Sequence, residues 1–150
     1  MTDLAAIHLI TTTKYKYAYG IDTKDWDLYR SIFTDEIVMD FSSYSGQPKK
    51  TMRADDWVAG CQRLFTGLDA SQHQMYNPLV DIQGDEARIR IYMQAEHFLQ
   101  NRAGDASFTL GGWYDDRLVK SPDGWRITAV TLNVLWSRGN RSIMQLAISE

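Results

Sequence analysis

The chain is poor in cysteine, proline and histidine, with one, three and three of them among its 150 residues. A single thiol, Cys61, can form neither an internal disulfide nor a thiolate metal cage, which excludes a disulfide scaffold and a zinc finger and favours the cytoplasm. No apolar run approaches the roughly 20 residues of a membrane span. The N-terminus lacks the basic and apolar regions of a signal peptide. Glycine motifs of nucleotide-binding loops and nucleophile elbows are also missing.

The sequence also lacks a large excess of positive or negative charge. Sixteen basic and nineteen acidic side chains give a net charge of -3, so we expect neither nucleic acid nor a membrane surface as partner. A length of 150 residues is typical of one domain, and 44% hydrophobic residues can bury a full core. The most loop-like stretch, residues 42–50, is too short to separate domains. We therefore predict a single domain over residues 1–150.

Apolar residues recur at steps of three and four in the first half of the chain, which predicts helices. The first helix is expected over residues 4–21, with a break at Gly20, and Asp22 or Thr23 is expected to cap the second. A short strand is expected over residues 36–41 and a third helix over residues 54–68.

From residue 72 onward the period changes to two, which predicts long strands. We expect them over residues 72–83, 87–100, 108–120 and 125–136, joined by hairpin turns. Gly111 and Gly112 in mid-strand indicate a bulge or sharp curvature. Helices followed by antiparallel strands predict an α+β fold, in which N-terminal helices cover a cone-shaped, strongly curved and mostly antiparallel sheet around a central pocket.

Two histidines carry the most chemical information. His97 lies on the apolar face of its predicted strand, and His73 begins the neighbouring strand. A neutral core histidine bonded to a backbone carbonyl would explain His97 alone. Two inward histidines on adjacent strands instead favour a general base or acid, because imidazole exchanges protons near neutral pH. Asp22 is either a helix cap or the acceptor that orients one imidazole, and the two roles are compatible.

The other candidate site residues are hydrogen-bond donors and an apolar wall. Tyr17, Tyr44, Tyr114 and Asn133 can donate to a substrate carbonyl, although most tyrosines serve packing. The histidines lack the local spacing of a metal site, so we expect no metal and no cofactor. The wall of a substrate site is expected to come from Tyr17, Phe41, Met75, Met93, Val130, Leu132, Val134 and Trp136.

These residues resemble the SnoaL-like families of the nuclear transport factor two superfamily and, within them, the scytalone dehydratase family. The strongest element is Asp22-Thr23-Lys24-Asp25-Trp26-Asp27, which is similar to an Asp-Ser-Lys-Asp-Trp-Asp stretch of that family. The family removes water from a hydroxylated bicyclic ketone without metal or cofactor, using an Asp-His pair, a second His, two Tyr and a Ser/Asn pair. The resemblance implies that Asp22, His73 and His97 are the first three of these groups.

The chain also departs from the family pattern. Ile21 and Phe41 stand where the family has its two tyrosines, and Tyr114 falls near the Ser/Asn pair. Because the groups that polarise the family's substrate carbonyl are missing, the resemblance implies kinship rather than activity on scytalone.

The leading hypothesis is a cofactor-independent acid/base enzyme of the dehydratase, isomerase or cyclase type that acts on a small hydrophobic carbonyl compound. His73, oriented by Asp22, would abstract a proton, and His97 would donate one. The alternative is a non-catalytic module that binds a small ligand or assembles as a homo-oligomer, a dimer or trimer. Outward aromatic residues at Tyr92, Phe98 and Trp113 motivate this alternative.

Overall fold

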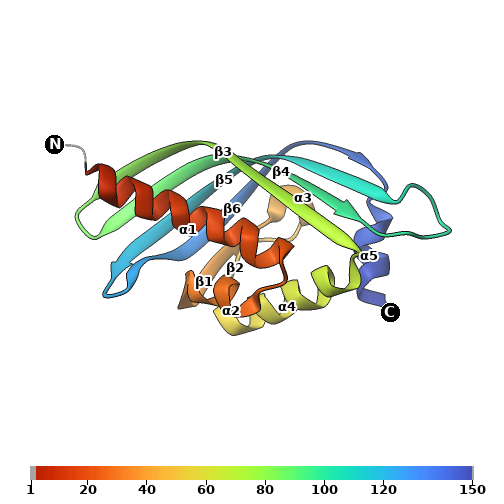
Figure 1. The fold of residues 1–150 in the computed structure, drawn as a ribbon, viewed down its shortest axis with the longest axis horizontal. Helices are drawn as coiled ribbons and strands as arrows, with labels where there is room; N and C mark the ends of the chain where they lie inside the picture. The colour runs from red at the N-terminus through yellow and green to blue at the C-terminus, as the bar shows by residue number, and fades with distance from the viewer. Residues whose placement is uncertain (1–2, 150) are drawn as a thin grey trace.

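The structure is a computed structural model that describes residues 3–149. Its elements are α1 (Leu4–Asp22), α2 (Trp26–Ser31), β1 (Phe33–Asp40), α3 (Ser42–Ser45), β2 (Lys50–Arg53), α4 (Ala54–Gly67), β3 (Ala70–Gln83), β4 (Glu86–Phe98), β5 (Ser107–Ser121), β6 (Gly124–Gly139) and α5 (Ser142–Ser149). In Figure 1 α1 runs across the long strands, and α4 and α5 lie together near the C-terminus. Helices first and long strands second confirm the predicted α+β order.

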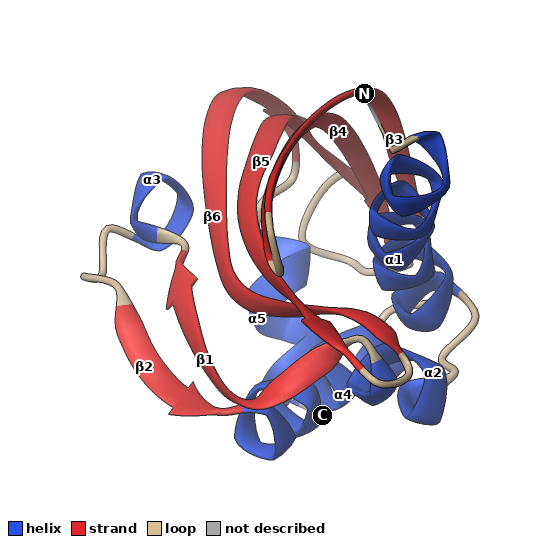
Figure 2. Cartoon of the chain, turned by 90° about the vertical axis from the view of Figure 1, so that its left-hand side faces the viewer, coloured by secondary structure: helices blue, strands red, loops and turns tan. Residues whose placement is uncertain are grey.

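The six strands form one curved sheet in the order β2-β1-β6-β5-β4-β3. Only β1 and β6 pair in parallel among these neighbours, so the predicted mostly antiparallel sheet is confirmed. Figure 2 shows β3 to β6 arching over one side of the molecule, with α1 along β3 and α4 below. We call the sheet face covered by α1 and α4 the inner face. Its apolar residues form the core, including the fully buried Phe33, Ile89 and Ile127.

The junction between the first two helices differs from the prediction. Helix α1 continues through Gly20 to Asp22, and Asp25, rather than Asp22 or Thr23, caps α2 by accepting a 3.0 Å hydrogen bond from the backbone N–H of Leu28. A Cβ atom at Gly20 would lie 2.7 Å from the Cβ of Tyr29. Gly20 therefore lets α2 pack closely against α1 and does not mark a helix end.

Replacing Gly20 with alanine is expected to lower the free energy of unfolding by about 1–3 kcal/mol, because the backbone of Tyr29 would have to move. The matched control is Gly60→Ala in α4, where an added Cβ meets nothing within 4 Å. That substitution should raise stability by about 0.5–1 kcal/mol through helix propensity. Urea unfolding followed by circular dichroism measures both values, and equal shifts would contradict the packing role of Gly20.

Three short elements were outside the predicted set. Helix α3 and strand β2 occupy most of the predicted loop and the residues after it. Helix α5 packs on α4 and buries Ile143 and Ala147. The backbone of Ala147 comes so close to Gly67 that a Cβ atom there would overlap it. The C-terminal segment therefore supports α4 within the same chain. Between residues 3 and 149, no helix combines the length and apolar character needed to cross a membrane.

Candidate active site

Asp22 and His73 meet where the end of α1 lies beside the edge strand β3. The Nδ1 atom of His73 is 2.7 Å from Oδ1 of Asp22. The backbone N–H of His73 donates to Oδ2 at 2.6 Å, and the hydroxyl of Ser71 donates to Oδ1 at 2.8 Å. Because β3 is the edge strand of the sheet that residues 3–149 form, its outward N–H is available to the carboxylate. Three donors therefore fix both oxygens of Asp22.

These contacts also favour the charged form of Asp22 and place a proton on Nδ1 of His73. Partial burial alone would raise the pKa of Asp22, but the hydrogen bonds and charge interaction with His73 outweigh it and lower the pKa below 3.8. Since a carboxylate only accepts hydrogen bonds, Nδ1 of His73 must carry a proton. Nε2 of a neutral His73 is then unprotonated and available as a base. The His73 side chain is 4% exposed, so this base is shielded from bulk water.

His97 lies beside His73 but makes a different contact. Its Nδ1 donates to the backbone carbonyl of Phe108 at 3.0 Å, and its ring stands 5.9 Å from that of His73 and nearly perpendicular to it. The ring of Phe65 packs against both imidazoles. Burial, with a contribution from His73, lowers the pKa of His97 to about 4. Burial thus favours the neutral form of His97, in which Nδ1 carries the proton and Nε2 is a hydrogen-bond acceptor.

The free energy of unfolding is expected to fall as the pH drops from about 6.5 to 4. In this pH range residue 97 binds a proton in the unfolded chain, whereas the buried imidazole of the folded protein does not. The shift corresponds to at most about 3 kcal/mol. Asp22 adds its own loss only at lower pH, since its pKa is lowered from 3.8. His97→Gln should flatten this slope, whereas His8→Gln on the exposed surface of α1 should keep it. Urea unfolding at a series of pH values tests this, and an unchanged slope in His97→Gln would contradict it.

Most of the predicted wall lies on the inner face. Tyr17, Met93, Tyr114, Val130 and Leu132 are buried in the core, and Phe41, Met75 and Val134 are half-buried against it. The inner face of β5 carries no side chain at Gly112, between buried Leu110 and Tyr114, because a Cβ there would overlap the carbonyl of Asn133. Tyr44 is half-buried, and its carbonyl accepts a hydrogen bond from Arg141.

Two predicted site residues lie elsewhere, which corrects the sequence analysis. Asn133 on β6 pairs with Trp113 on β5, which in turn pairs with Tyr92 on β4. Paired residues point to the same face of a sheet, and Tyr92 is exposed, so Asn133 lies on the outer face. Trp136 is 42% exposed and covers Gly111, where a Cβ would overlap its ring. A register shift between Gly111 and Gly112 breaks the alternation of β6. The paired glycines indicated a bulge, but the prediction carried an unbroken alternation through it.

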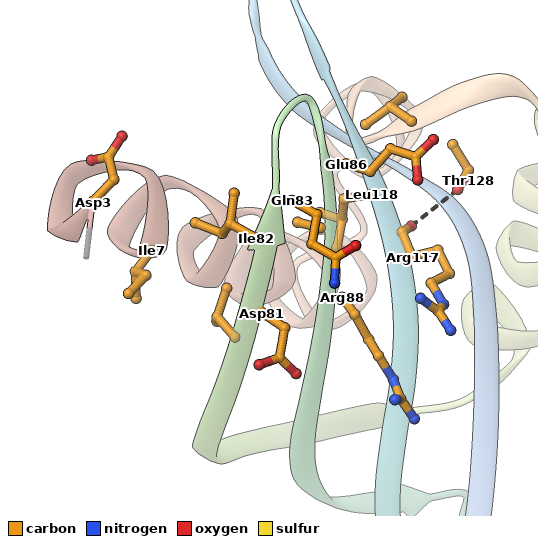
Figure 3. Close-up of a pocket in the computed structure, with 13 residues that line it drawn as sticks. Asp3, Ile7, Asp81, Ile82, Gln83, Glu86, Arg88, Arg117, Leu118 and Thr128 are labelled. Atoms are coloured by element: carbon orange, nitrogen blue, oxygen red, sulfur yellow. Dashed lines mark hydrogen bonds between the residues drawn. The ribbon is translucent and has the colours of Figure 1, made fainter. Parts of the chain in front are cut away.

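A groove of about 550 Å³ reaches the Asp22–His73 pair from the outside of α1 and β3. Its other lining residues are Tyr15, Ala18, Tyr19, Thr23, Ala70, Ser71, Gln72, Met75 and Phe98. A larger hollow, about 840 Å³, lies beside the β3–β4 hairpin and contains none of the predicted site residues (Figure 3). Of these two hollows, the smaller groove is therefore the one that touches the Asp22–His73 pair.

Sequence reasoning missed several residues around this site. Ser71, two residues before His73 on the same strand face, could have been found from the strand period. Phe65 touches both histidines only because α4 folds back over the sheet. Lys14 forms a buried ion pair with Asp116, 2.7 Å between Nζ and Oδ2. Within residues 3–149, no three His, Cys, Asp or Glu side chains gather as metal ligands would.

Residues 2–131 match the SnoaL-like domain family. The chain belongs to this family. The family match confirms the predicted resemblance to SnoaL-like proteins, and the predicted curved sheet with covering helices is also found in similar solved structures.

Relatives of this SnoaL-like domain include proteins without a described activity. An uncharacterized protein of Mycobacterium tuberculosis is 28% identical over 113 residues, which cover 74% of this chain and 73% of that protein. The crystal structure of the Kfla4162 protein from Kribbella flavida is 29% identical, covers 94% of this chain and 97% of its own, and superimposes with a TM-score of 0.89. A candidate scytalone dehydratase from Novosphingobium aromaticivorans is 19% identical, covers 92% and 89%, and has a TM-score of 0.79, which shows a shared fold.

Proposed function

We propose that this SnoaL-like domain is a cofactor-independent acid/base enzyme that removes water from a small, largely apolar β-hydroxy ketone, or isomerises or cyclises a related carbonyl compound. The observation that carries the proposal is the pair of Asp22 and His73, 2.7 Å apart, with the imidazole 4% exposed and facing a second buried histidine. An imidazole that is shielded from bulk water and hydrogen-bonded through one nitrogen to a carboxylate is typical of a general base.

In the proposed elimination, Nε2 of His73 takes the proton from the carbon next to the carbonyl, and the electron pair moves toward the carbonyl oxygen as an enolate. The enolate then expels the β-hydroxyl group, the carbon–carbon double bond forms, and the imidazolium of His73 returns its proton to the departing oxygen as water. Asp22 stabilises the imidazolium between these steps. His97 accepts a hydrogen bond from the substrate hydroxyl at Nε2 and orients it. Tyr114, on the inner face of β5, would donate to the enolate.

The test is deuterium exchange in heavy water with a panel of bicyclic ketones, with and without a β-hydroxyl group. Mass spectrometry follows both deuterium uptake next to the carbonyl and loss of water. The wild-type protein is expected to catalyse uptake with at least one ketone, and His73→Gln is expected to lose that activity. Equal uptake by wild-type protein and His73→Gln would exclude His73 as the base.

A second function, assembly with another copy of this chain, is favoured by an exposed apolar area on the outer face of the sheet. Leu135 is 62% exposed, and Tyr76 and Tyr92 lie with ring centroids 5.7 Å apart. Leu135 and Tyr92 line a hollow of about 680 Å³ together with Leu79 and Trp113. Arginines and aspartates occur together along the same strands, as in the 2.8 Å contact of Arg88 with Asp115, so two copies of this face can be complementary in charge.

Light scattering tests the assembly. The wild-type protein is expected to be a dimer or trimer at micromolar concentration, and Leu135→Lys on the outer face is expected to be a monomer. The matched control is Leu9→Lys, because Leu9 is half-exposed on α1 rather than on the sheet. A monomeric wild-type protein, or a Leu135→Lys variant that still assembles, would contradict an interface on this face.

A further inference from the structure

The buried ion pair of Lys14 and Asp116 is the least expected feature of the core. Lys14 lies on the inner side of α1 and Asp116 on β5, and both side chains are 0% exposed. Desolvation on burial lowers the pKa of Lys14 and raises that of Asp116 to about 6, so both charged forms are disfavoured by their surroundings. Apolar residues of similar size would often be at least as stable in such a position. Stability alone is therefore a weak explanation for the pair.

Two tyrosine rings complete the surroundings of the Lys14 ammonium. Its Nζ atom lies 3.5 Å from the ring centroid of Tyr114 and 3.8 Å from that of Tyr17. The two rings are 5.4 Å apart, and Asp116 closes the remaining contact at 2.7 Å. A cation on the face of an aromatic ring in a dry interior interacts strongly with it. Lys14 therefore fixes both rings and applies a positive charge to them.

Both tyrosines lie between the ion pair and the Asp22–His73 pair. Tyr17 follows Lys14 by three residues on α1 and precedes Asp22 by five, so it lies on the same helix between the two. Tyr114 is on the inner face of β5, and the next inner position toward His97 is Gly112, which has no side chain. Burial raises the pKa of Tyr114, a hydrogen bond with Tyr17 opposes this shift, and the charges of Asp116 and Asp22 raise the pKa further. The phenol of Tyr114 thus keeps its proton and remains a donor.

We propose that Lys14, held by Asp116, is a positioning residue that fixes Tyr114 and strengthens its phenol as a hydrogen-bond donor to the substrate's developing enolate. This inference rests on the proposed function. The physical reason is electrostatic: a cation at the ring face stabilises negative charge that the phenol shares with an acceptor oxygen. Asp116 keeps the ammonium in place and charged within the core.

The probe for this inference is 4-nitrophenol, a planar phenol whose anion is coloured and carries its charge on an oxygen, as an enolate does. The wild-type protein is expected to bind it as the anion, and Tyr114→Phe should weaken that binding. The test variant is Lys14→Met with Asp116→Leu, which removes both charges and leaves neither buried alone. It should bind the anion about 10-fold more weakly. When Tyr114 is already replaced by phenylalanine, the same double change should have no further effect on binding of the anion. A merely structural role of the ion pair would instead weaken binding in both backgrounds.

The outcomes separate the inference from the proposed function. Wild-type protein that does not bind the anion overturns the inference, whereas the proposed function is decided separately by deuterium uptake in wild-type protein and His73→Gln. Binding that depends on Tyr114 but is unchanged in the double variant overturns the role of Lys14 and leaves the proposed function standing. Circular dichroism checks that the double variant folds. If it does not, Lys14→Gln with Asp116→Asn, a neutral pair that can still hydrogen-bond, gives the same decision.

Discussion

Replacing Asp22 with asparagine is expected to lower the rate of proton abstraction by roughly 10³- to 10⁴-fold. The backbone N–H of His73 donates to one carboxylate oxygen, so the amide oxygen of the variant takes that position. The amide NH₂ group then faces Nδ1 of His73 and donates to it, where the carboxylate had accepted. The proton of a neutral His73 moves to Nε2, which removes the base from the side that faces His97. The variant should fold normally and fail as a catalyst.

The rate of deuterium uptake into a bicyclic ketone measures this effect. Ser71→Ala is the matched control, because it removes a 2.8 Å hydrogen bond to the same carboxylate without changing the charge or the tautomer of His73. We expect Ser71→Ala to lower the rate by no more than about 10-fold. An Asp22→Asn variant whose rate stays close to that of Ser71→Ala would contradict the tautomer argument.

Replacing Asp116 with alanine is expected to destabilise the fold by about 3–5 kcal/mol, because the buried ammonium of Lys14 loses its counter-charge. Removing both charges, as in Lys14→Met with Asp116→Leu, should cost far less and can be neutral. Urea unfolding gives both values. A similar loss in the single and double variants would show that packing, and not the unpaired charge, causes it.

The single Asp116→Ala variant also has a characteristic pH dependence. Burial lowers the pKa of Lys14 in the folded protein, so above the folded pKa the unfolded chain binds more protons than the folded one. Stability of the variant should therefore rise once the pH exceeds the lowered folded pKa of Lys14, where the buried charge is lost, and level off near the ordinary pKa of lysine, 10.5. A variant whose stability is flat over that range would contradict the lowered pKa of the buried Lys14 ammonium.

The long elements were predictable because their hydrophobic period is regular over many residues. The alternation in residues 87–100 predicts β4, which spans Glu86–Phe98, and the helical stripe near residue 57 predicts α4, which spans Ala54–Gly67. The end of α1 was not predictable in the same way. Gly20 reads locally as a helix break, and only the approach of Tyr29 shows why glycine is required inside the helix.

The candidate site was predictable as a set of residue types and not as a set of roles. Two histidines on the inner positions of adjacent strands follow from a period of two, so their proximity could be expected. The role of His97 depends on its hydrogen bond to the carbonyl of Phe108, a backbone group that has no signature in the sequence. Likewise, the bulge at Gly111 turns Trp136 outward, and one inserted residue reverses every later side chain in β6.

The sequence by itself determined the α+β order, the two inward histidines and the carboxylate available to them, because period and residue chemistry are local properties. One cysteine and few histidines also limited the chemistry to a small set of groups. The tertiary structure alone decided that Asp22 holds His73 at 2.7 Å, that burial lowers the pKa of His97, and that Lys14 pairs with Asp116 between two tyrosine rings. These properties depend on distance and desolvation between residues that are far apart in the chain, and folding sets both.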